Sequence, residues 1–266
     1  MGRPAKSDFT DALFSIARRR TVITGGTAGI GLGVARHFVS AGADVVVTGR
    51  REQGHQRADS VGATFVRMDV RDDASVERAL ADAVRALGGL DILILNAGIA
   101  RPCGPLEALD LDTFREVLEV NLFGVMRGLR YGLAHMERGG VVLVTSSPGG
   151  RQALAAPGTV AYSASKAALD MVVQSAGLEL ADRGIRVSGV IPGFINTEIA
   201  AASPSPPTWL ARLTATGEAR DAEAMGPVFH FLASDAGSML QASVVAADDG
   251  CSAGLSSSVL SRLVGA

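Results

Sequence analysis

Seven short runs rich in valine, isoleucine and threonine recur along the chain, and helical patterns separate them. The runs predict strands at residues 21–24, 44–48, 64–68, 91–95, 141–145, 185–191 and 243–246. Apolar residues spaced three and four apart predict helices at 30–40, 74–87, 113–136 and 161–181. Strands that alternate with helices are joined by right-handed crossovers and form a parallel sheet with helices on both faces. The runs are apolar throughout, as strands buried on both faces are, so an α/β fold is predicted.

Composition narrows the class of protein further. With 47 % hydrophobic and 20 % charged residues among 266, the chain has ample material for a folded core. Its formal charge of −2 provides no broad field to attract nucleic acid or an anionic membrane, and its apolar stretches fall short of the ~20 residues that cross a bilayer. Cys103 and Cys251 lack metal-ligand spacing, and no secretion signal precedes them. We therefore expect a cytoplasmic protein with no metal, nucleic-acid or membrane partner.

The predicted domain organisation is simple. Residues 1–19 end in a basic cluster at 18–20, but Asp8 and Asp11 favour a solvated N-terminal extension over a targeting arm. Residues 20–266 show no composition shift that marks a linker, and we expect one domain there.

A loop is predicted over residues 197–220, because Ser-Pro-Ser-Pro-Pro at 203–207 breaks regular structure. In a parallel sheet, ligands bind beyond the carboxyl ends of the strands, and this loop follows one such end. It is either a substrate lid or only a connection. Trp209, Leu210 and Leu213 either contact an uncharged, partly apolar substrate or pack the loop down.

A glycine-rich sequence joins the first predicted strand to the first predicted helix. Residues 24–31 read Thr-Gly-Gly-Thr-Ala-Gly-Ile-Gly. Glycines there permit a tight turn and let backbone N–H groups approach a pyrophosphate at the positive end of a helix. An ordinary strand-to-helix turn needs only one glycine, so a dinucleotide site is favoured. The candidate residues are Gly25, Thr27, Gly29, Ile30 and Gly31.

The end of the second predicted strand indicates which dinucleotide binds. An acidic residue there would accept from a ribose 2′-hydroxyl, whereas arginine pairs with a 2′-phosphate. This chain has Gly49 followed by Arg50, and a guanidinium offers charged, forked donors to phosphate. NADP(H) is therefore preferred, with NAD(H) as the alternative if Arg50 and Arg51 are only solvated surface residues.

Polar residues close the next two predicted strands. The Asp69 carboxylate either accepts from an adenine amino group or caps the helix that begins near Asp72. Asn96, with Ala97 and Gly98, closes the fourth strand at the same edge, where a dinucleotide would lie.

Candidate catalytic groups gather in the second half of the chain. Tyr162 and Lys166 are four residues apart in a predicted helix and so share one face. A nearby cation favours phenolate, which moves the pKa of tyrosine from about 10 toward a range useful for proton transfer. Ser147 ends the fifth strand, where a hydroxyl can hold a substrate carbonyl. Asn121 lies in an apolar helical run and is either a structural bridge or part of a water-linked proton route.

Taken together and in order, these motifs resemble the short-chain dehydrogenase/reductase family in its compact, single-domain branch. The resemblance covers nearly everything from Arg20 to about Gly250. It implies a Rossmann-type, doubly wound sheet of seven parallel strands in the order 3-2-1-4-5-6-7. It also implies a homotetramer or dimer built partly from the helices at 113–136 and 161–181.

The resemblance assigns roles to the candidate residues. Tyr162 is the proton donor or acceptor, Lys166 lowers its pKa and binds the nicotinamide ribose, Ser147 orients the carbonyl, and Asn121 holds a relay water. Contacts to the remaining parts of the cofactor are implied for Asp69, Val70, Asn96, Ala97, Gly98, Pro192, Gly193, Ile195 and Thr197.

The chain departs from the family pattern near Ser147. This serine stands fifteen residues before Tyr162, two more than the family pattern has, so an insertion is expected at 151–156 and Ser146 stays as a minor alternative. Pro148 restricts Ser147 to an extended conformation.

These features predict an NADP(H)-dependent oxidoreductase that interconverts a small ketone or aldehyde and an alcohol. The rival from another class is an NADP(H)-binding sensor or interaction protein without turnover. An isomerase or dehydratase on the same scaffold is a lesser alternative, since no sizeable C-terminal substrate domain is present.

Overall fold

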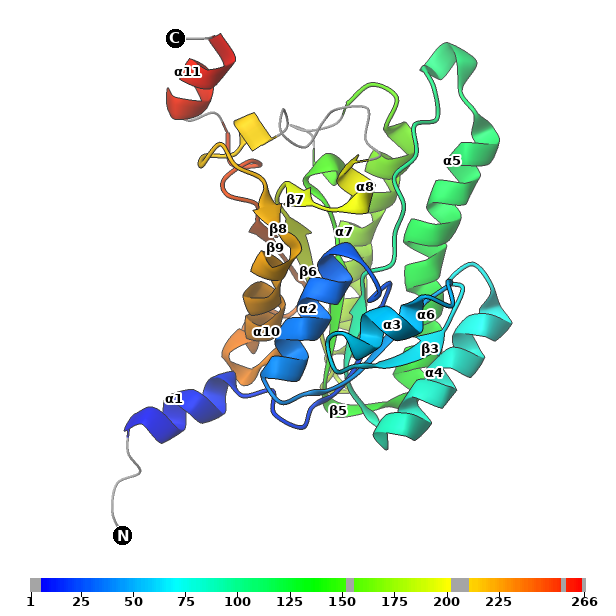
Figure 1. The fold of residues 1–266 in the computed structure, drawn as a ribbon, viewed down its shortest axis with the longest axis vertical. Helices are drawn as coiled ribbons and strands as arrows, with labels where there is room; N and C mark the ends of the chain where they lie inside the picture. The colour runs from blue at the N-terminus through cyan, green and yellow to red at the C-terminus, as the bar shows by residue number, and fades with distance from the viewer. Residues whose placement is uncertain (1–5, 152–155, 202–210, 255–256, 265–266) are drawn as a thin grey trace.

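A single parallel sheet forms the centre of the molecule in the computed structural model, which describes residues 6–151, 156–201, 211–254 and 257–264 (Figure 1). Its seven strands follow the order β3-β2-β1-β4-β5-β6-β9, which confirms the predicted sheet. The strands are β1 (Arg20–Thr24), β2 (Asp44–Gly49), β3 (Thr64–Arg67), β4 (Leu90–Leu95), β5 (Met136–Thr145), β6 (Arg186–Pro192) and β9 (Ser243–Ala247). A short parallel pair that the sequence did not predict, β7 (Ile195–Asn196) and β8 (Arg220–Asp221), lies outside this sheet.

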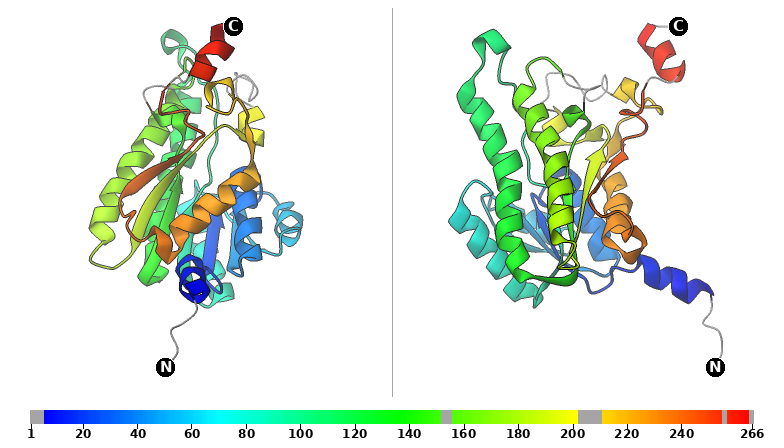
Figure 2. Two further views of the ribbon diagram at one scale, coloured as in Figure 1. Left: turned by 90° about the vertical axis from the view of Figure 1, so that its left-hand side faces the viewer. Right: turned by 180° about the vertical axis from the view of Figure 1, so that it is seen from behind.

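Helices cover both faces of the sheet, as the views in Figure 2 show. Neighbouring strand residues point to opposite faces: Ile23 packs with Phe38 and Phe229, whereas Val22 packs with Leu80. Both faces are therefore apolar, which explains why the strands do not alternate between polar and apolar residues. The helices are α2 (Gly29–Ser40), α3 (Gly54–Asp59), α4 (Asp73–Leu87), α5 (Leu111–Leu118), α6 (Gly124–Gly132), α7 (Val160–Leu180), α8 (Glu198–Ala201), α10 (Gly226–Ala233) and α11 (Ser257–Val264).

The prediction of one continuous helix at residues 113–136 is wrong. Residues 113–136 are divided between α5 and α6 by a π-helical segment, Glu119–Phe123, and a 3-10 turn at Leu133–His135 ends the run. Met136 already belongs to β5, which pairs with β4 through a bulge between Leu90 and Ile92. Periodicity could not reveal the π segment, because one extra residue in a turn hardly changes the apolar pattern.

The N-terminal extension includes a helix, α1 (Lys6–Phe14), that projects from the body of the molecule (Figure 2). Its last turn is attached: the Phe14 carbonyl lies 2.6 Å from His230 Nε2 on α10. Beyond it, Ile16 is fully buried, whereas Phe9 and Phe14 are exposed. The extension is therefore solvated along most of its length and held at its C-terminal end.

No helix in the described part of the chain combines the length and the apolar character that crossing a membrane requires.

Candidate active site

A cavity of about 630 Å³ lies at the carboxyl ends of the parallel strands. Loops from β1, β2, β4, β5 and β6 converge there because the strands run parallel, as is usual for ligand sites in such sheets. Two of the predicted site residues, Gly31 and Asn121, do not line this cavity. The others line the cavity: Gly25, Thr27, Gly29, Ile30, Arg50, Asp69, Val70, Asn96, Ala97, Gly98, Ser147, Tyr162, Lys166, Pro192, Gly193, Ile195 and Thr197.

The glycine loop makes a tight turn into α2. Gly25 and Gly29 have φ angles of +64° and +50°, the left-handed region that glycine adopts without strain. A Cβ on Gly31 would lie 2.4 Å from the Gly25 carbonyl oxygen, so only glycine fits below the loop. Ala28, at the N-cap of α2, gives no side-chain hydrogen bond to the helix. The start of α2 lines the cavity, and its first N–H groups lack a side-chain cap, so they are suited to donate to an anion there.

Asn96 ties the glycine loop to the sheet. Its Nδ2 donates to the carbonyl oxygens of Thr24 and Gly25, both at 3.2 Å, and its Oδ1 accepts from Thr145 Oγ1 at 3.2 Å. One amide thus joins the ends of β1, β4 and β5 and fixes the floor of the cavity.

Arg50 follows Gly49 at the end of β2, on the wall of the cavity. A Cβ on Gly49 would lie 2.8 Å from Thr27 Oγ1, so a larger, acidic side chain at position 49 would displace Thr27. The exposed Arg50 side chain follows position 49 in the chain. Asp69 lines the same cavity, close enough to Arg50 for that positive charge to help lower the pKa of Asp69.

Asp69 is not the helix cap that the sequence allowed as an alternative. The N-cap of α4 is Asp72, whose carboxylate accepts from the Ser75 backbone N–H. The Asp69 carboxylate accepts from Arg71, from the backbone N–H at 3.0 Å and from Nη2 at 2.6 Å. These hydrogen bonds lower the pKa of Asp69, which keeps it ionised at the cavity wall.

The face of α7 that carries Tyr162 and Lys166 forms the far wall of the cavity. Lys166 is 5 % exposed, its Nζ lies 5.8 Å from the centre of the Tyr162 ring, and it donates to the Thr145 carbonyl oxygen at 2.8 Å. Burial lowers the pKa of Lys166 to about 8, and the Asp170 carboxylate opposes this change. Burial raises the pKa of Tyr162, and a hydrogen bond with Ser147 opposes that change.

The two serines at the end of β5 have different partners. Ser147 bonds with Tyr162, and its Oγ accepts from the Gly149 N–H at 3.2 Å. Ser146 also lines the cavity, but its Oγ donates to Asp170 Oδ1 at 2.6 Å. Ser147 has φ −162° and ψ 150°, which confirms the extended conformation expected before Pro148.

Asn121 lies in the π-helical segment between α5 and α6. Its Oδ1 accepts from the Ile99 N–H at 2.8 Å, while its Nδ2 donates to the Ile99 carbonyl at 2.9 Å and to Ser165 Oγ at 3.0 Å. It thus links the loop after β4 to α7 beside Lys166. Segments of π-helix recur at functional sites, because the extra residue redirects one side chain.

The segment after β6 forms the remaining wall. A Cβ on Gly29 would lie 3.1 Å from Thr197 Cγ2, so this segment closes over the glycine loop. Glu198, Ile199 and Ala200 of α8 also line the cavity. Of the predicted substrate loop, residues 202–210 lie outside the described residues, including 203–207, Trp209 and Leu210.

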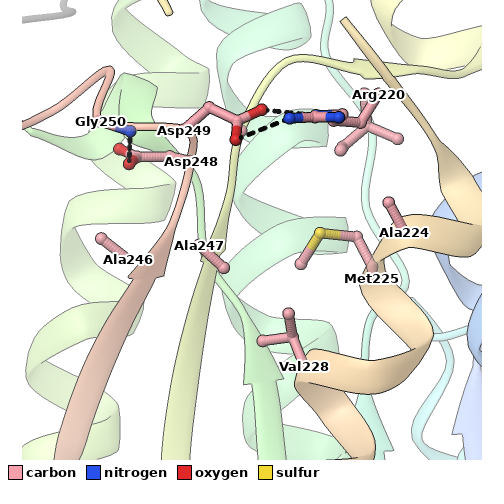
Figure 3. Close-up of a pocket in the computed structure, with 11 residues that line it drawn as sticks. Arg220, Ala224, Met225, Val228, Ala246, Ala247, Asp248, Asp249 and Gly250 are labelled. Atoms are coloured by element: carbon pink, nitrogen blue, oxygen red, sulfur yellow. Dashed lines mark hydrogen bonds and ion pairs between the residues drawn. The ribbon is translucent and has the colours of Figure 1, made fainter. Parts of the chain in front are cut away.

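A second cavity of about 370 Å³ lies between the end of β9 and the start of α10 (Figure 3). Met225, Val228, Ala246 and Ala247 form its apolar walls, and an ion pair between Arg220 and Asp249 spans its rim at 2.8 Å. Within the described ranges, no group of three or more histidine, cysteine or acidic side chains could hold a metal ion.

Sequence reasoning missed the group of polar residues behind Lys166. Asp170 accepts from Ser146 and pairs with Arg151, and Thr145 provides the acceptor for Lys166 through its backbone. The signal for Asp170 was its spacing, since it stands four residues after Lys166 and eight after Tyr162 on one helical face.

Comparison with known proteins identifies the family. The family model described as enoyl-(acyl carrier protein) reductase matches residues 25–252. The cis-4-hydroxycyclohexanecarboxylate dehydrogenase of Sinomonas cyclohexanicum is 35 % identical over 254 residues, which are 90 % of this chain and 98 % of that protein. A dehydrogenase/reductase of Sinorhizobium meliloti superposes with a TM-score of 0.84 at 30 % identity, over 92 % of this chain and 99 % of that one.

A further structure, the 3-ketoacyl-(acyl-carrier-protein) reductase of Brucella melitensis complexed with NADH, superposes with a TM-score of 0.83 at 27 % identity. The superposition covers 90 % of this chain and 100 % of the Brucella chain. The fold, the ordered motifs and these matches define one class of protein. The chain belongs to the short-chain dehydrogenase/reductase family and is an oxidoreductase.

Proposed function

We propose that this protein is an NADP(H)-dependent oxidoreductase that interconverts a small ketone or aldehyde and the corresponding alcohol, with Tyr162 as the proton-transfer group. One observation carries the proposal. Tyr162, Ser147 and Lys166 line the same cavity as the glycine loop and the uncapped N-terminus of α2.

The cavity residues fit a dinucleotide. The N–H groups at the start of α2 and the closely packed glycines suit a pyrophosphate, and the space below the loop excludes a Cβ at Gly31. Arg50 would pair with a 2′-phosphate, and Lys166 would bind the nicotinamide ribose with the protons that Thr145 does not engage. When bound, the cofactor would supply or accept the hydride.

The protein residues then handle the substrate oxygen and its proton. Ser147 would donate to the carbonyl oxygen and hold it next to Tyr162. The raised pKa of Tyr162 keeps the phenol protonated at neutral pH, ready to give its proton during reduction. Oxidation requires the phenolate, which the Lys166 ammonium beside it would favour.

Asn121 would position this machinery. Both ends of its amide are bonded to protein groups, which supports the structural bridge over a water ligand among the two roles considered for it. Through Ile99 and Ser165 it would hold the loop after β4 at a fixed distance from α7.

The substrate class follows from the cavity walls and from one relative. Ile99, Pro157, Phe194 and Ile199 are apolar residues among those that line the cavity, which suits an uncharged or partly apolar molecule. The Sinomonas relative is named for a hydroxylated cyclohexane carboxylate. Among the substrates of the proposed reaction, these features favour small alcohols and carbonyl compounds, cyclic ones included.

Association of several copies is part of the proposal. Phe123 and Met126, together with Met171 and Leu178 of α7, are exposed apolar residues on the helices that were expected to form the contact between copies. A homo-oligomer would cover these side chains.

The choice of cofactor is tested by Arg50→Ala. A charged hydrogen bond to phosphate contributes about 1.5–3 kcal/mol, so NADPH affinity should fall about tenfold or more while NADH affinity stays unchanged. Nicotinamide fluorescence titration measures both affinities. Arg57→Ala, the same change on the exposed face of α3, serves as the control. Wild-type protein that binds NADH more tightly than NADPH would contradict the assignment.

A panel of ketones and aldehydes with NADPH tests turnover in the same protein. Reduction of any member supports an enzyme. Tight NADPH binding without turnover of any member would favour the sensor or interaction protein instead.

A further inference from the structure

Asp170 holds both ends of the turn that carries Ser147. Its Oδ1 accepts from Ser146 Oγ at 2.6 Å, and its Oδ2 lies 3.0 Å from Arg151 Nε. Ser146 and Arg151 flank the 3-10 turn Pro148–Gly150, so one carboxylate on α7 fixes the turn before and after Ser147. The Asp170 side chain is only 14 % exposed, so solvent screens these contacts weakly.

The turn rests directly on the catalytic face of α7. A Cβ on Gly150 would lie 2.8 Å from the Ala167 N and from the Lys166 carbonyl carbon, and a Cβ on Gly149 would lie 3.3 Å from Tyr162 Cε1. At Gly150 no side chain fits between the turn and the helix, and at Gly149 the space is tight. Any displacement of the turn therefore moves Ser147 relative to Tyr162.

Asp170 is also the acidic group nearest to Lys166 in the helix, one turn further along the same face. The groups bonded to Lys166 from other elements are neutral in the described part of the chain: the Thr145 carbonyl at the end of β5 and Ser146 directly after that strand. Asn121 and Lys166 both lie beside Gly98. On its own helix, Tyr162 and Asp170 are titratable. Arg151, directly after the turn, carries a positive charge and pairs with Asp170.

We propose that Asp170 is a positioning residue of the active site, which clamps the Ser147 turn to α7 through Ser146 and Arg151 and provides the counter-charge to the Lys166 ammonium. Its role in turnover rests on the proposed function above. Its effect on Lys166 does not, because it is a property of the protein without cofactor.

Two substitutions that break the same ion pair separate this role from a merely structural one. Asp170→Asn removes the counter-charge and is expected to lower the pKa of Lys166 by about one unit from about 8. Arg151→Gln removes the cation that competes with Lys166 for Asp170, and it is therefore expected to raise the pKa of Lys166. Loosening of the turn alone would move both variants in the same direction.

The measurement is a ¹³C NMR titration of the lysine Cε atoms in labelled protein without cofactor. The chain has only two lysines, Lys6 and Lys166, and Lys6→Arg assigns the signals. Glu179→Gln, an exposed carboxylate on α7, is the matched control and should leave the pKa of Lys166 unchanged. Asp170→Glu keeps the negative charge, so the pKa of Lys166 in this variant should return most of the way to the wild-type value. Unchanged values in both Asp170→Asn and Arg151→Gln, or shifts in the same direction, overturn the proposal.

Alcohol oxidation gives the functional result. The two variants change the charge beside Lys166 and Tyr162 in opposite senses, so the acid limb of the kcat/KM profile should move in opposite directions in Asp170→Asn and in Arg151→Gln. A uniform loss of rate with unmoved limbs contradicts the proposal. If the wild type oxidises no alcohol, the proposed function fails, while the lysine titration still decides the role of Asp170.

Discussion

Replacement of Tyr162 by phenylalanine should reduce carbonyl turnover by roughly 10²–10⁴-fold, the usual contribution of a positioned proton donor. The substitution removes only the hydroxyl that bonds with Ser147, and the ring keeps its place above Lys166. NADPH affinity should therefore stay nearly unchanged. Steady-state kcat and KM with NADPH, together with nicotinamide fluorescence titration, measure the two quantities separately.

The chain provides a matched control for this substitution. Its other tyrosine, Tyr131, donates to Asp73 Oδ1 at 3.0 Å on the outer surface of α6 and α4. Tyr131→Phe makes the same chemical change far from the cavity and should leave turnover intact. Equal activity in wild type and Tyr162→Phe would exclude Tyr162 as the proton-transfer group.

Gly31→Ala should weaken NADPH binding roughly 100-fold. The added Cβ would lie 2.4 Å from the Gly25 carbonyl oxygen and 2.6 Å from Asn96 Nδ2, so the glycine loop has to move. Overpacking of this kind costs about 1–3 kcal/mol, and 1.4 kcal/mol is about a tenfold change in affinity. Fluorescence titration gives the affinity, and thermal unfolding gives the stability.

Gly33→Ala on the same helix distinguishes lost binding from lost stability. Its Cβ would lie 2.6 Å from the Ala222 carbonyl oxygen, away from the glycine loop. Both variants should unfold at lower temperature, but only Gly31→Ala should lose affinity. Equal affinities in the two variants would contradict the placement of the cofactor at this loop.

The sheet could be predicted from the sequence because its causes are local. Each buried strand is an apolar run, and the strand-helix alternation leaves few topologies once crossovers are right-handed. The same locality explains Ser147, since Pro148 alone imposes the extended conformation that the structure shows.

Features that depend on distant partners could not be predicted. The π segment around Asn121 is maintained by hydrogen bonds to Ile99 and Ser165, which are remote in sequence. Asp69 could be a cap or a ligand group, and the structure shows it bonded to Arg71 because Asp72 takes the cap. The partners of Asp170 lie 19 and 24 residues away, so its spacing from Lys166 was the sole local signal.

The most direct test of the central claim is isotope transfer from the cofactor to the product. Wild-type protein is incubated with a carbonyl substrate and NADPH deuterated at C4, with each epimer used in turn. The proposed function predicts deuterium on the carbinol carbon of the product from one epimer. In Tyr162→Phe this deuterated product should form roughly 10²–10⁴-fold more slowly. Product that contains no deuterium with either epimer, or no product with any carbonyl although NADPH binds, would contradict the assignment of this protein as an NADP(H)-dependent oxidoreductase.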